Sequence, residues 1–532
     1  MKYPFQKPYS FSLLIALFLT LFSIPPTPTK ADPPVTPAAI TLPTPTRTWT
    51  SPGNTTYYID SQHGSDSNDG HSASHAWRTL AKVNAGTFGP GDRILLHAGS
   101  AWNGFLGPAG SGTEAAPLII DRYGRGPKPK IDAQGQWLSA LYLSNSSYVT
   151  VRNLDIANHG PTPQPKLTGV KVSAADFGTI HEVVLDSLDI HDVTGSNDKD
   201  AGGGSGIDCS CWSSKVPTRF DGLLIQNCHL TRTDRNGITM SGAWARKDWY
   251  PSLHVVIRHN LLEDIGGDGI VPIACDGALI EYNILRGGRM RALDYAAGIW
   301  PWSCDNTVIQ HNEVSGMKGT HDGEGFDSDW NCRNSLFQYN YSHDNDGGFM
   351  LICDDGSSKM PYNAGNTGTI IRYNISVNDG LHTFNMSGPC SNTKIYNNTI
   401  YLGDGSANQL VASGNWGGGW PTGTRFTNNV FVVTHNVGKV GKVGFDFGGM
   451  QDVAFQNNTF WGDFENRPDD PKALLSDPLL LKPGGNLPSD YRPRAASPCF
   501  NAGRPIPDNG GRDFAGNPIP QNAPPTVGAF QI

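Results

Sequence analysis

A short acidic segment, HDGEGFDSDWNC (residues 321–332), holds the side chains best suited to chemistry. Asp327 and Asp329 are separated by one serine within a strand-like stretch, so both carboxylates would point to the same face of a strand. Their Cα atoms would lie about 6.6 Å apart, a range in which one carboxyl can donate a proton while the other activates water or attacks an anomeric carbon. The pair therefore predicts glycoside hydrolysis, with inversion and retention both left open.

Further candidates lie near this pair in the sequence. Glu324 precedes the same strand and Asp346 precedes the equivalent strand of the next repeat, which makes both of them supporting catalytic candidates. Indole rings stack on the CH-rich faces of sugars, and histidine can transfer protons near neutral pH. The side chains expected to line a substrate groove are Trp300, Trp302, Asp294, Asp268, His321 and His343.

Each of these candidates also has a purely structural interpretation. Clustered oxygens suit calcium, so Asp327 and Asp329 could ligate a Ca²⁺ ion or form a solvated strand face. The two tryptophans could pack beneath a long loop, and the two histidines could be hydrogen-bond donors in loops. We expect no required cofactor, and calcium is the one metal that the sequence leaves open; no metal ligands are assigned.

A repeat determines which element carries these residues. A unit of one apolar residue, two variable residues and one asparagine recurs at intervals of 23 to 34 residues. Short strands at this spacing, without helical periodicity between them, predict a solenoid of stacked β-coils in which the apolar residue points inward and the asparagine occupies a turn. Inward stacking disfavours glycosylation of sequons such as Asn374-Ile-Ser. The recurring asparagines are Asn227, Asn260, Asn283, Asn312, Asn340, Asn374, Asn398, Asn429 and Asn458.

A second strand in each coil begins at a glycine, as in GIWPWSC, GFDSDWNC and GFMLIC. The apolar residue after each glycine should face the core, and strand alternation then defines the outer face. Two outer rows are expected: Trp300, Asp327 and Met350, and, one pleat further along, Trp302, Asp329 and Ile352. The acidic pair would therefore lie beside two indole rings of the neighbouring coil, as a sugar-binding catalytic groove requires.

The N-terminal stretch YYIDSQHGSDSNDGHSASHAWRTLAKVNAGTFGPGDRILLHAGSAWNG, with its Gly91-Asp92 turn, adds to the repeat. With the closing segment SPCFNAGRPIPDNGGRDFAGNPIPQNAPPTVGAF, it makes residues 55–532 resemble the right-handed parallel β-helix superfamily of carbohydrate-active enzymes, the pectate-lyase-like fold. The resemblance implies an all-β, right-handed parallel β-helix over residues 55–465. It also implies a short N-terminal capping helix around Trp77–Asn84 and an irregular C-terminal tail, residues 466–532, packed on the β-helix.

The first residues predict export. MKYPFQKPYSFSLLIALFLTLFS has a lysine near its start and a short apolar core from Phe11 to Phe22, typical of a secretory signal cleaved after Ala31. An uncleaved N-terminal anchor is the alternative. Residues 32–54 form a Pro/Thr-rich linker. We expect a secreted or periplasmic monomer with no membrane span after signal removal. A net charge of −8 argues against nucleic-acid binding.

Nine cysteines are too few for a disulfide scaffold at this length, and their odd number leaves at least one unpaired. The aligned Cys275, Cys304, Cys332 and Cys353 are expected to stack as small apolar residues at a turn, or else to pair in alternate coils.

The sequence favours a secreted glycoside hydrolase that cleaves a polysaccharide or an oligosaccharide. One alternative is a polysaccharide lyase that acts on a uronate polymer by calcium-assisted β-elimination, with a base among Arg289, Arg291, Lys318, His321 and Arg333. The other is a non-catalytic glycan-binding solenoid, which should show a uniform ladder of aromatic residues. Instead, the unusual residues concentrate in two or three coils, which favours a catalytic centre.

Overall fold

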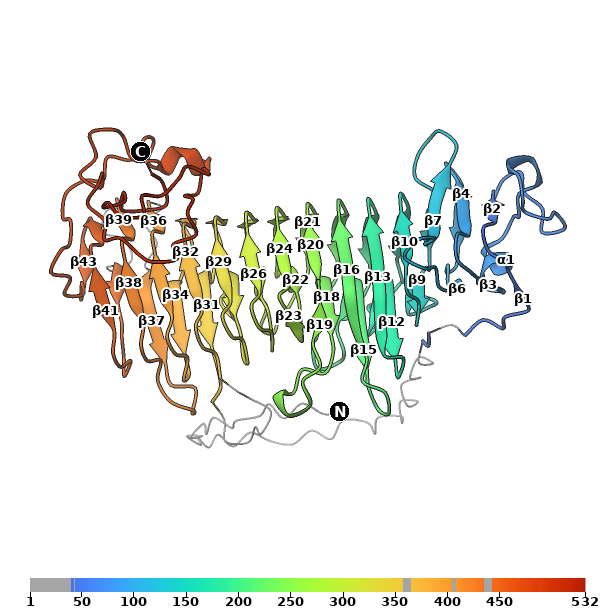
Figure 1. Cartoon of the computed structure of the whole chain (residues 1–532), viewed down its shortest axis with the longest axis horizontal. Coiled ribbons are helices and arrows are strands. Elements are labelled where there is room, and N and C mark those ends of the chain that lie inside the picture. Colours follow the sequence, from blue (N-terminus) through green and yellow to red (C-terminus); the bar gives the residue numbers. More distant parts are fainter. Residues whose placement is uncertain (1–39, 43, 357–364, 404–407, 435–442, 532) are drawn as a thin grey trace, which may run out of the picture.

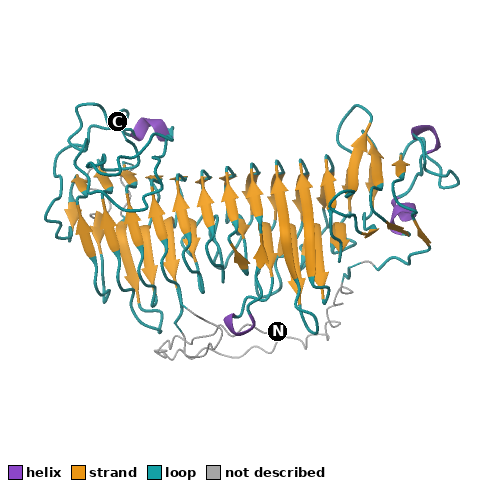
Figure 2. Ribbon diagram, viewed as in Figure 1, coloured by secondary structure: helices purple, strands orange, loops and turns teal. Residues whose placement is uncertain are grey.

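The computed structural model describes residues 40–42, 44–356, 365–403, 408–434 and 443–531. The expected signal segment and the first part of the linker lie outside these residues. The described chain winds into an elongated stack of coils, with its N-terminal coils at one end and its C-terminal coils at the other (Figure 1). Almost all of its regular structure is strand (Figure 2), and the named strands pair in parallel, so the predicted parallel β-helix is confirmed.

The coils form three faces, and the first is a 16-stranded sheet. It contains β2 (Thr56–Ile59), β4 (Arg93–His97), β7 (Leu118–Tyr123), β10 (Val149–Arg152), β13 (Thr179–Asp186), β16 (Arg219–Gln226), β20 (Val256–Arg258), β24 (Leu279–Glu281), β26 (Val308–Gln310), β29 (Leu336–Gln338), β32 (Ile370–Arg372), β35 (Lys394–Tyr396), β38 (Arg425–Thr427) and β41 (Ala454–Gln456), with β19 (Ser252–Leu253) and β23 (Cys275–Asp276) beside this path.

The second face is a 13-stranded sheet. It contains β5 (Ala101–Asn103), β8 (Lys130–Asp132), β11 (Asp155–Asn158), β14 (Asp189–Val193), β17 (His229–Thr233), β21 (Leu261–Ile265), β25 (Ile284–Arg286), β27 (Glu313–Ser315), β30 (Tyr341–His343), β33 (Ile375–Val377), β36 (Thr399–Leu402), β39 (Val430–Val433) and β42 (Thr459–Trp461). A separate three-stranded sheet near the N-terminal end joins β1 (Trp49–Thr50), β3 (Gly86–Phe88) and β6 (Ala109–Gly110).

The third face is divided into two sheets. One contains β9 (Ser139–Ser144), β12 (Leu167–Ala175), β15 (Gly204–Trp212), β18 (Asn236–Ser241) and β22 (Ile270–Val271). The other contains β28 (Glu324–Ser328), β31 (Gly348–Cys353), β34 (His382–Ser387), β37 (Gln409–Gly414), β40 (Val443–Phe445) and β43 (Phe464–Glu465). Between β22 and β28 runs the segment IWPWS, which makes only isolated bridges such as Ile270 to Ile299 and Ile299 to Phe326. Pro301 lacks the N–H that a continuous ladder would use there.

One apolar cluster fills the stack along its length. From Asn260 on, the apolar residue three positions before each repeated asparagine points into it, as predicted; Ile257, Ile280 and Ile309 are completely buried. Before Asn227 the prediction is wrong, because Leu224 is only partly buried and Ile225 takes the core position. The asparagines form an internal ladder in which each side-chain amide donates to the next side-chain oxygen at 2.9–3.1 Å, from Asn260 through Asn458. Their burial excludes a glycan on the folded protein at ladder positions such as Asn374.

Asn227 is a correction to this ladder. It has a left-handed backbone (φ 55°) and occupies the turn that precedes the ladder position, which Cys228 fills in that coil. The Cys228 N–H donates to the side-chain oxygen of Asn260 at 2.9 Å, as a ladder asparagine would. Asparagine is common both in left-handed turns and in stacked ladders, so a single Asn cannot distinguish the two positions.

Helices are few and short. The helix α1 (Leu80–Asn84) begins three residues after the start of the predicted range, and η1 (Ala73–His75), η2 (Arg246–Asp248) and η3 (Pro488–Tyr491) are single 3₁₀ turns. The irregular C-terminal tail packs on the second face, where Tyr491 and Phe530 join a cluster with Tyr341 and Ile375. No helix among the described residues is long and apolar enough to cross a membrane.

All nine cysteines are described, and all nine are buried free thiols, so the alternative of pairing between coils is wrong for this structure. Cys275, Cys304 and Cys332 belong to the apolar core, as expected of stacked small residues. Cys353 does not follow this pattern and faces away from the core, toward the acidic segment.

Candidate active site

The acidic pair and the two indoles share the outer side of the third face. Ile299 pairs with Phe326, whose ring is in the core, so Trp300 lies beside Asp327 on the opposite side of the chain. Two residues further on, the Asp329 N–H donates to the Pro301 carbonyl at 3.3 Å, which places Asp329 beside Trp302. The predicted neighbourhood of the acidic pair and the indoles is therefore present.

The expected outer row is wrong in the next coil. Glu324 pairs with Gly348, which has a φ of 140°, and Phe326 pairs with Met350. Met350 and Ile352 consequently point into the core, while Leu351 takes the outer position beside Asp327. The glycine that seemed equivalent to the start of β28 lies one residue out of register, so Cys353, rather than a core residue, follows Asp329 in the outer row.

Burial divides the acids of this segment into two classes. Glu324 and Asp327 are 1% and 3% exposed, whereas Asp322 and Asp329 remain partly exposed. Burial raises the pKa of Glu324 to about 8, and the charge of Asp322 adds to the rise. Burial and the adjacent Asp329 hold the pKa of Asp327 well above its usual range. These four acids, Asp322, Glu324, Asp327 and Asp329, form the acid cluster, and only Asp322 and Asp329 among them are accessible to solvent.

The two accessible acids have pKa values near neutrality. Burial raises the pKa of Asp329 to about 7 and that of Asp322 to about 6. Near pH 6–7 such a cluster holds protonated and ionised carboxyls together, the state that acid–base catalysis at a glycosidic bond requires. A nearby lysine, Lys199, lowers the pKa values of Asp322, Asp327 and Asp329, because its positive charge favours their ionised forms.

Asp322 was not among the predicted site residues. The strand was expected to begin at Gly325, but β28 begins at Glu324, and the chain enters it through two left-handed residues, Asp322 (φ 59°) and Gly323 (φ 82°). A bridge from Asp322 to Ala296 fixes this turn against the previous coil. The Asp-Gly dipeptide, typical of tight turns, was the signal in the sequence that a side chain could be redirected here.

Asp268 is buried against Trp300 and does not line the exposed surface of the site. It is 1% exposed, and its Oδ1 accepts the Trp300 indole N–H at 3.1 Å and the Ala297 N–H at 3.0 Å. Its Oδ2 forms ion pairs with Arg235 at 3.3 Å and with Lys199 at 3.5 Å. Because both oxygens are engaged within the protein, the expectation that Asp268 binds substrate is replaced by a role in orienting Trp300.

Asp294 fixes two loops beside Trp300. Its Oδ2 accepts the Lys199 backbone N–H at 2.8 Å, and its Oδ1 pairs with the fully buried Arg235 at 2.9 Å. The Lys199 ammonium then lies 5.4 Å from the centre of the Trp300 ring system. Lys199 comes from a loop more than 100 residues away in sequence from the acidic segment, and nothing in the sequence marked it.

A second loop contributes another tryptophan that sequence reasoning did not assign. Trp244 stacks on Trp302, with ring centroids 4.7 Å apart and planes inclined by 28°. The loop is held by the Trp249 indole, which donates to the Ser303 carbonyl at 3.0 Å, and by an Arg246–Asp305 ion pair at 2.7 Å. This loop, SGAWARKDWYPS, connects β18 to β19.

Three predicted residues lie at the margin or elsewhere. His343 is on β30 in the second face, stacked on Tyr341 at 4.4 Å and paired with Asp344 at 2.8 Å, so its assignment to the groove is wrong. Asp346 accepts the Gly319 N–H at 2.8 Å and lies 3.6 Å from Lys318, which makes it a half-exposed loop anchor instead of a catalytic acid. His321 is exposed, 3.3 Å from the Leu293 carbonyl, and its charge lowers the pKa of Asp322.

One mixed donor set could hold a metal ion. Carboxylate oxygens of Asp327 and Asp329 and the sulfur of Cys353 lie within 4.8 Å of one another. Calcium takes six to eight oxygen ligands, and a thiol is a poor partner for it. This set therefore does not fit the calcium ion that the sequence left open.

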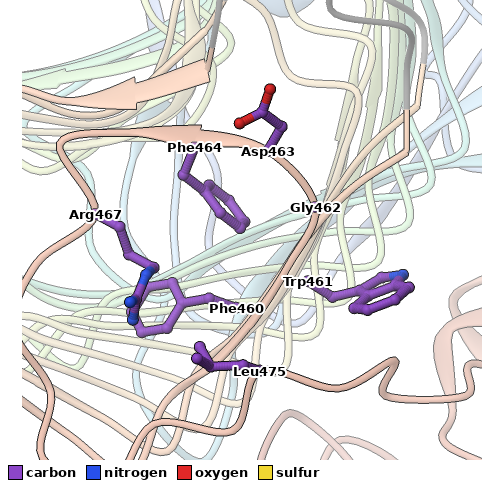
Figure 3. Close-up of a pocket in the computed structure, with 7 residues that line it drawn as sticks. All are labelled: Phe460, Trp461, Gly462, Asp463, Phe464, Arg467 and Leu475. Atoms are coloured by element: carbon purple, nitrogen blue, oxygen red, sulfur yellow. The ribbon is translucent and has the colours of Figure 1, made fainter.

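The hollow shown in Figure 3 lies at the C-terminal end of the stack. Its volume is about 430 Å³, and its lining residues are Phe460, Trp461, Gly462, Asp463, Phe464, Arg467 and Leu475. It borders β43, five strands along the sheet from β28. The acid cluster and this hollow are therefore separate features.

Comparison with known proteins found lacto-N-biosidases similar to this chain. The chain is 29% identical to a lacto-N-biosidase of Bifidobacterium longum subsp. longum over 91% of its own length, and it spans about 37% of the length of that relative. A crystal structure of a GH136 lacto-N-biosidase from Eubacterium ramulus has a TM-score of 0.59 and 27% identity, covering 76% of this chain and 68% of that one. The chain is similar to GH136 lacto-N-biosidases over most of its length.

A complex of XylC with xylose, with a TM-score of 0.51 and 12% identity, covers 90% of this chain and 98% of that one, and shares the fold alone. No family model matches the sequence. These likenesses confirm the expected class of fold.

Proposed function

We propose that this protein is a glycoside hydrolase that cleaves lacto-N-bioside linkages in oligosaccharides, with Asp322 and Asp329 as the reacting carboxyls. The observation that carries the proposal is the pair of accessible acids with pKa values of about 6 and about 7 beside an indole-lined surface. The similarity to lacto-N-biosidases over 91% of the chain supports the substrate class.

The chemistry follows from the coexistence of two protonation states. A protonated carboxyl donates to the departing glycosidic oxygen, while an ionised carboxylate attacks the anomeric carbon or activates water. Trp302, already stacked on Trp244, and Trp300, oriented by Asp268, offer ring faces and edges against which a sugar can pack. Besides burial, the charge of Asp268 raises the pKa of Asp322, and the charge of Asp322 raises the pKa of Asp329.

Two of the five basic candidates near the acidic segment, Arg289 and Arg291, argue against the lyase alternative. Arg289 donates to the carbonyls of Lys318 and Asp294, each at 2.9 Å. Arg291 pairs with Asp264 at 2.5 Å and with Asp234 at 3.1 Å. Because these guanidinium groups hold loops together, they are not available as the base and carboxylate partner that β-elimination needs. Export and a monomeric state remain predictions that belong to the same proposal.

Product analysis tests the proposal. We expect the purified protein to release the disaccharide from p-nitrophenyl lacto-N-bioside and from neutral oligosaccharides that end in this unit, equally well with and without a chelator. Uronate polymers should give no unsaturated products that absorb in the ultraviolet. Hydrolysis absent across the neutral panel, or chelator-sensitive unsaturated products, would overturn it.

Azide identifies the role of each acid. In Asp322→Gly or Asp329→Gly, azide should restore turnover of the nitrophenyl substrate. If the reaction retains configuration, a glycosyl azide of retained configuration marks the acid–base residue and an inverted one marks the nucleophile; if the reaction inverts, an inverted glycosyl azide marks the general base. Rescue of neither variant would contradict the assignment of the pair.

A further inference from the structure

Cys353 is the thiol that touches the acid cluster. It ends β31 and is 2% exposed, with its sulfur 3.1 Å from Oδ1 of Asp329 and 4.0 Å from Oδ1 of Asp327. Two other buried thiols donate only to main-chain carbonyls: Cys332 to Pro301 at 3.3 Å and Cys390 to Ile352 at 3.5 Å. The carboxylate contact therefore distinguishes Cys353 from thiols of similar burial in neighbouring coils.

The chemical state of this thiol follows from its surroundings. Burial and the adjacent carboxylates raise the pKa of Cys353 well above 9, so the group keeps its proton wherever a glycosidase of this kind would operate. Toward the ionised carboxylate of Asp329 it therefore acts as a donor. The Trp330 N–H donates to the same oxygen at 2.7 Å. Two donors converge on Oδ1, whereas Oδ2 accepts from neither of them.

We propose that Cys353 is a positioning residue: its S–H holds Oδ1 of Asp329 and thereby makes Oδ2 the oxygen presented to the sugar. The inference rests on the proposed function, because it assigns a task to a neighbour of a reacting carboxyl. Neither the sequence pattern nor the fold requires a polar contact here, since the three core thiols Cys275, Cys304 and Cys332 stack without touching a carboxylate group.

The thiol of Cys353 affects the acidity of Asp329. A hydrogen bond to a carboxylate stabilises its ionised form and lowers its pKa, and the Cys353 contact acts in this direction on Asp329. Sulfur is a weak donor compared with a hydroxyl. Cys353→Ser should therefore lower the pKa of Asp329 further, and Cys353→Ala should raise it. This ordering holds whether Asp329 reacts in its protonated or its ionised form.

The test is the pH profile of kcat/KM for wild type, Cys353→Ser and Cys353→Ala on p-nitrophenyl lacto-N-bioside. For Cys353→Ala we expect the limb governed by Asp329 to move up by roughly 0.5–1 pH unit. We also expect kcat to fall roughly 5- to 20-fold while KM changes less than about twofold, because orientation is lost but binding is not. Cys353→Ser should move the same limb downward.

Cys332→Ala is the matched control, because it removes a buried thiol of the preceding coil whose hydrogen bond goes to a carbonyl. It should leave both limbs in place even if it lowers stability. If the pH profiles of wild type, Cys353→Ser and Cys353→Ala have their limbs at the same pH, the inference is overturned while the proposed function stays intact. If the wild-type protein does not hydrolyse the substrate, the proposed function is wrong. The thiol contact would then be tested by urea unfolding, where Cys353→Ala must lose more stability above pH 7 than below pH 5, and an equal loss refutes it.

Discussion

The buried carboxyl of Glu324 should make the stability of this protein depend on pH, and Glu324→Gln isolates that contribution. In the folded state its pKa is about 8, against 4.5 for an ordinary glutamate. The folded chain therefore retains a proton that the unfolded chain releases, and stability falls as pH rises from about 4.5 to about 8. At 1.36 kcal/mol per pH unit, this corresponds to at most about 4 kcal/mol by pH 8.

Part of the rise in the pKa of Glu324 comes from the charge of Asp322. Because water reaches Asp322 and screens its charge, we expect the loss of unfolding free energy to be about 2 kcal/mol. Glutamine has the same shape and does not titrate. Measured by urea unfolding, the difference in unfolding free energy between Glu324→Gln and wild type should therefore move in favour of the variant by about 2 kcal/mol between pH 5 and pH 8. The other buried acids also make the unfolding free energy depend on pH, but they contribute equally to both proteins and cancel in the difference.

Glu313→Gln provides a control of opposite sign. Its contacts with His343 and Arg286 lower the pKa of Glu313, so its charge stabilises the folded state above pH 4.5 and the variant should be the less stable protein at pH 8. If Glu324→Gln and wild type show the same pH dependence of unfolding, Glu324 titrates normally and the electrostatic account of the cluster is refuted.

Three other substitutions address binding and catalysis. Asp329→Asn and Asp322→Asn should each reduce kcat by about 10²–10⁴-fold with unchanged circular dichroism, and more than a tenth of wild-type activity in either variant contradicts its role. Trp302→Ala should raise KM roughly 5- to 10-fold through lost stacking, as initial rates would show, and an unchanged KM excludes a sugar contact. Asp268→Asn leaves Arg235 without one buried partner and should cost about 3 kcal/mol of unfolding free energy, and an unaltered unfolding midpoint would disprove that support.

Strand alternation predicted the part of the site that lies on extended chain, although only Asp327 belongs to a named strand, β28. The alternation in GIWPWSC and GFDSDWNC placed Trp300, Trp302, Asp327 and Asp329 on one side because a pleated strand leaves two choices for each residue. The same rule failed at Met350, where a glycine with φ of 140° shifts the register by one residue. Such a shift depends on how two coils pair, which one strand alone does not encode.

Strand alternation could not place the residues that come from loops and corners. Asp322 faces the cluster because two consecutive residues adopt left-handed backbone conformations. Lys199 and Trp244 reach Trp300 and Trp302 from loops of earlier coils, and their positions depend on tertiary contacts with Asp294 and Trp302. His343 is close in sequence to the acidic segment, but a corner of the coil carries it to another face.

The asparagine ladder sets a boundary for any shortened version of the protein. Its amides all donate in the same direction along the stack, and the last one, on Asn458, donates to the carboxylate of Asp470 at 2.9 Å. That carboxylate also accepts the Asn458 backbone N–H at 2.8 Å, so it closes the series with a group that only accepts. A chain cut before residue 470 would leave buried donors without acceptors, whereas excision of one whole coil would let the neighbouring amides meet again.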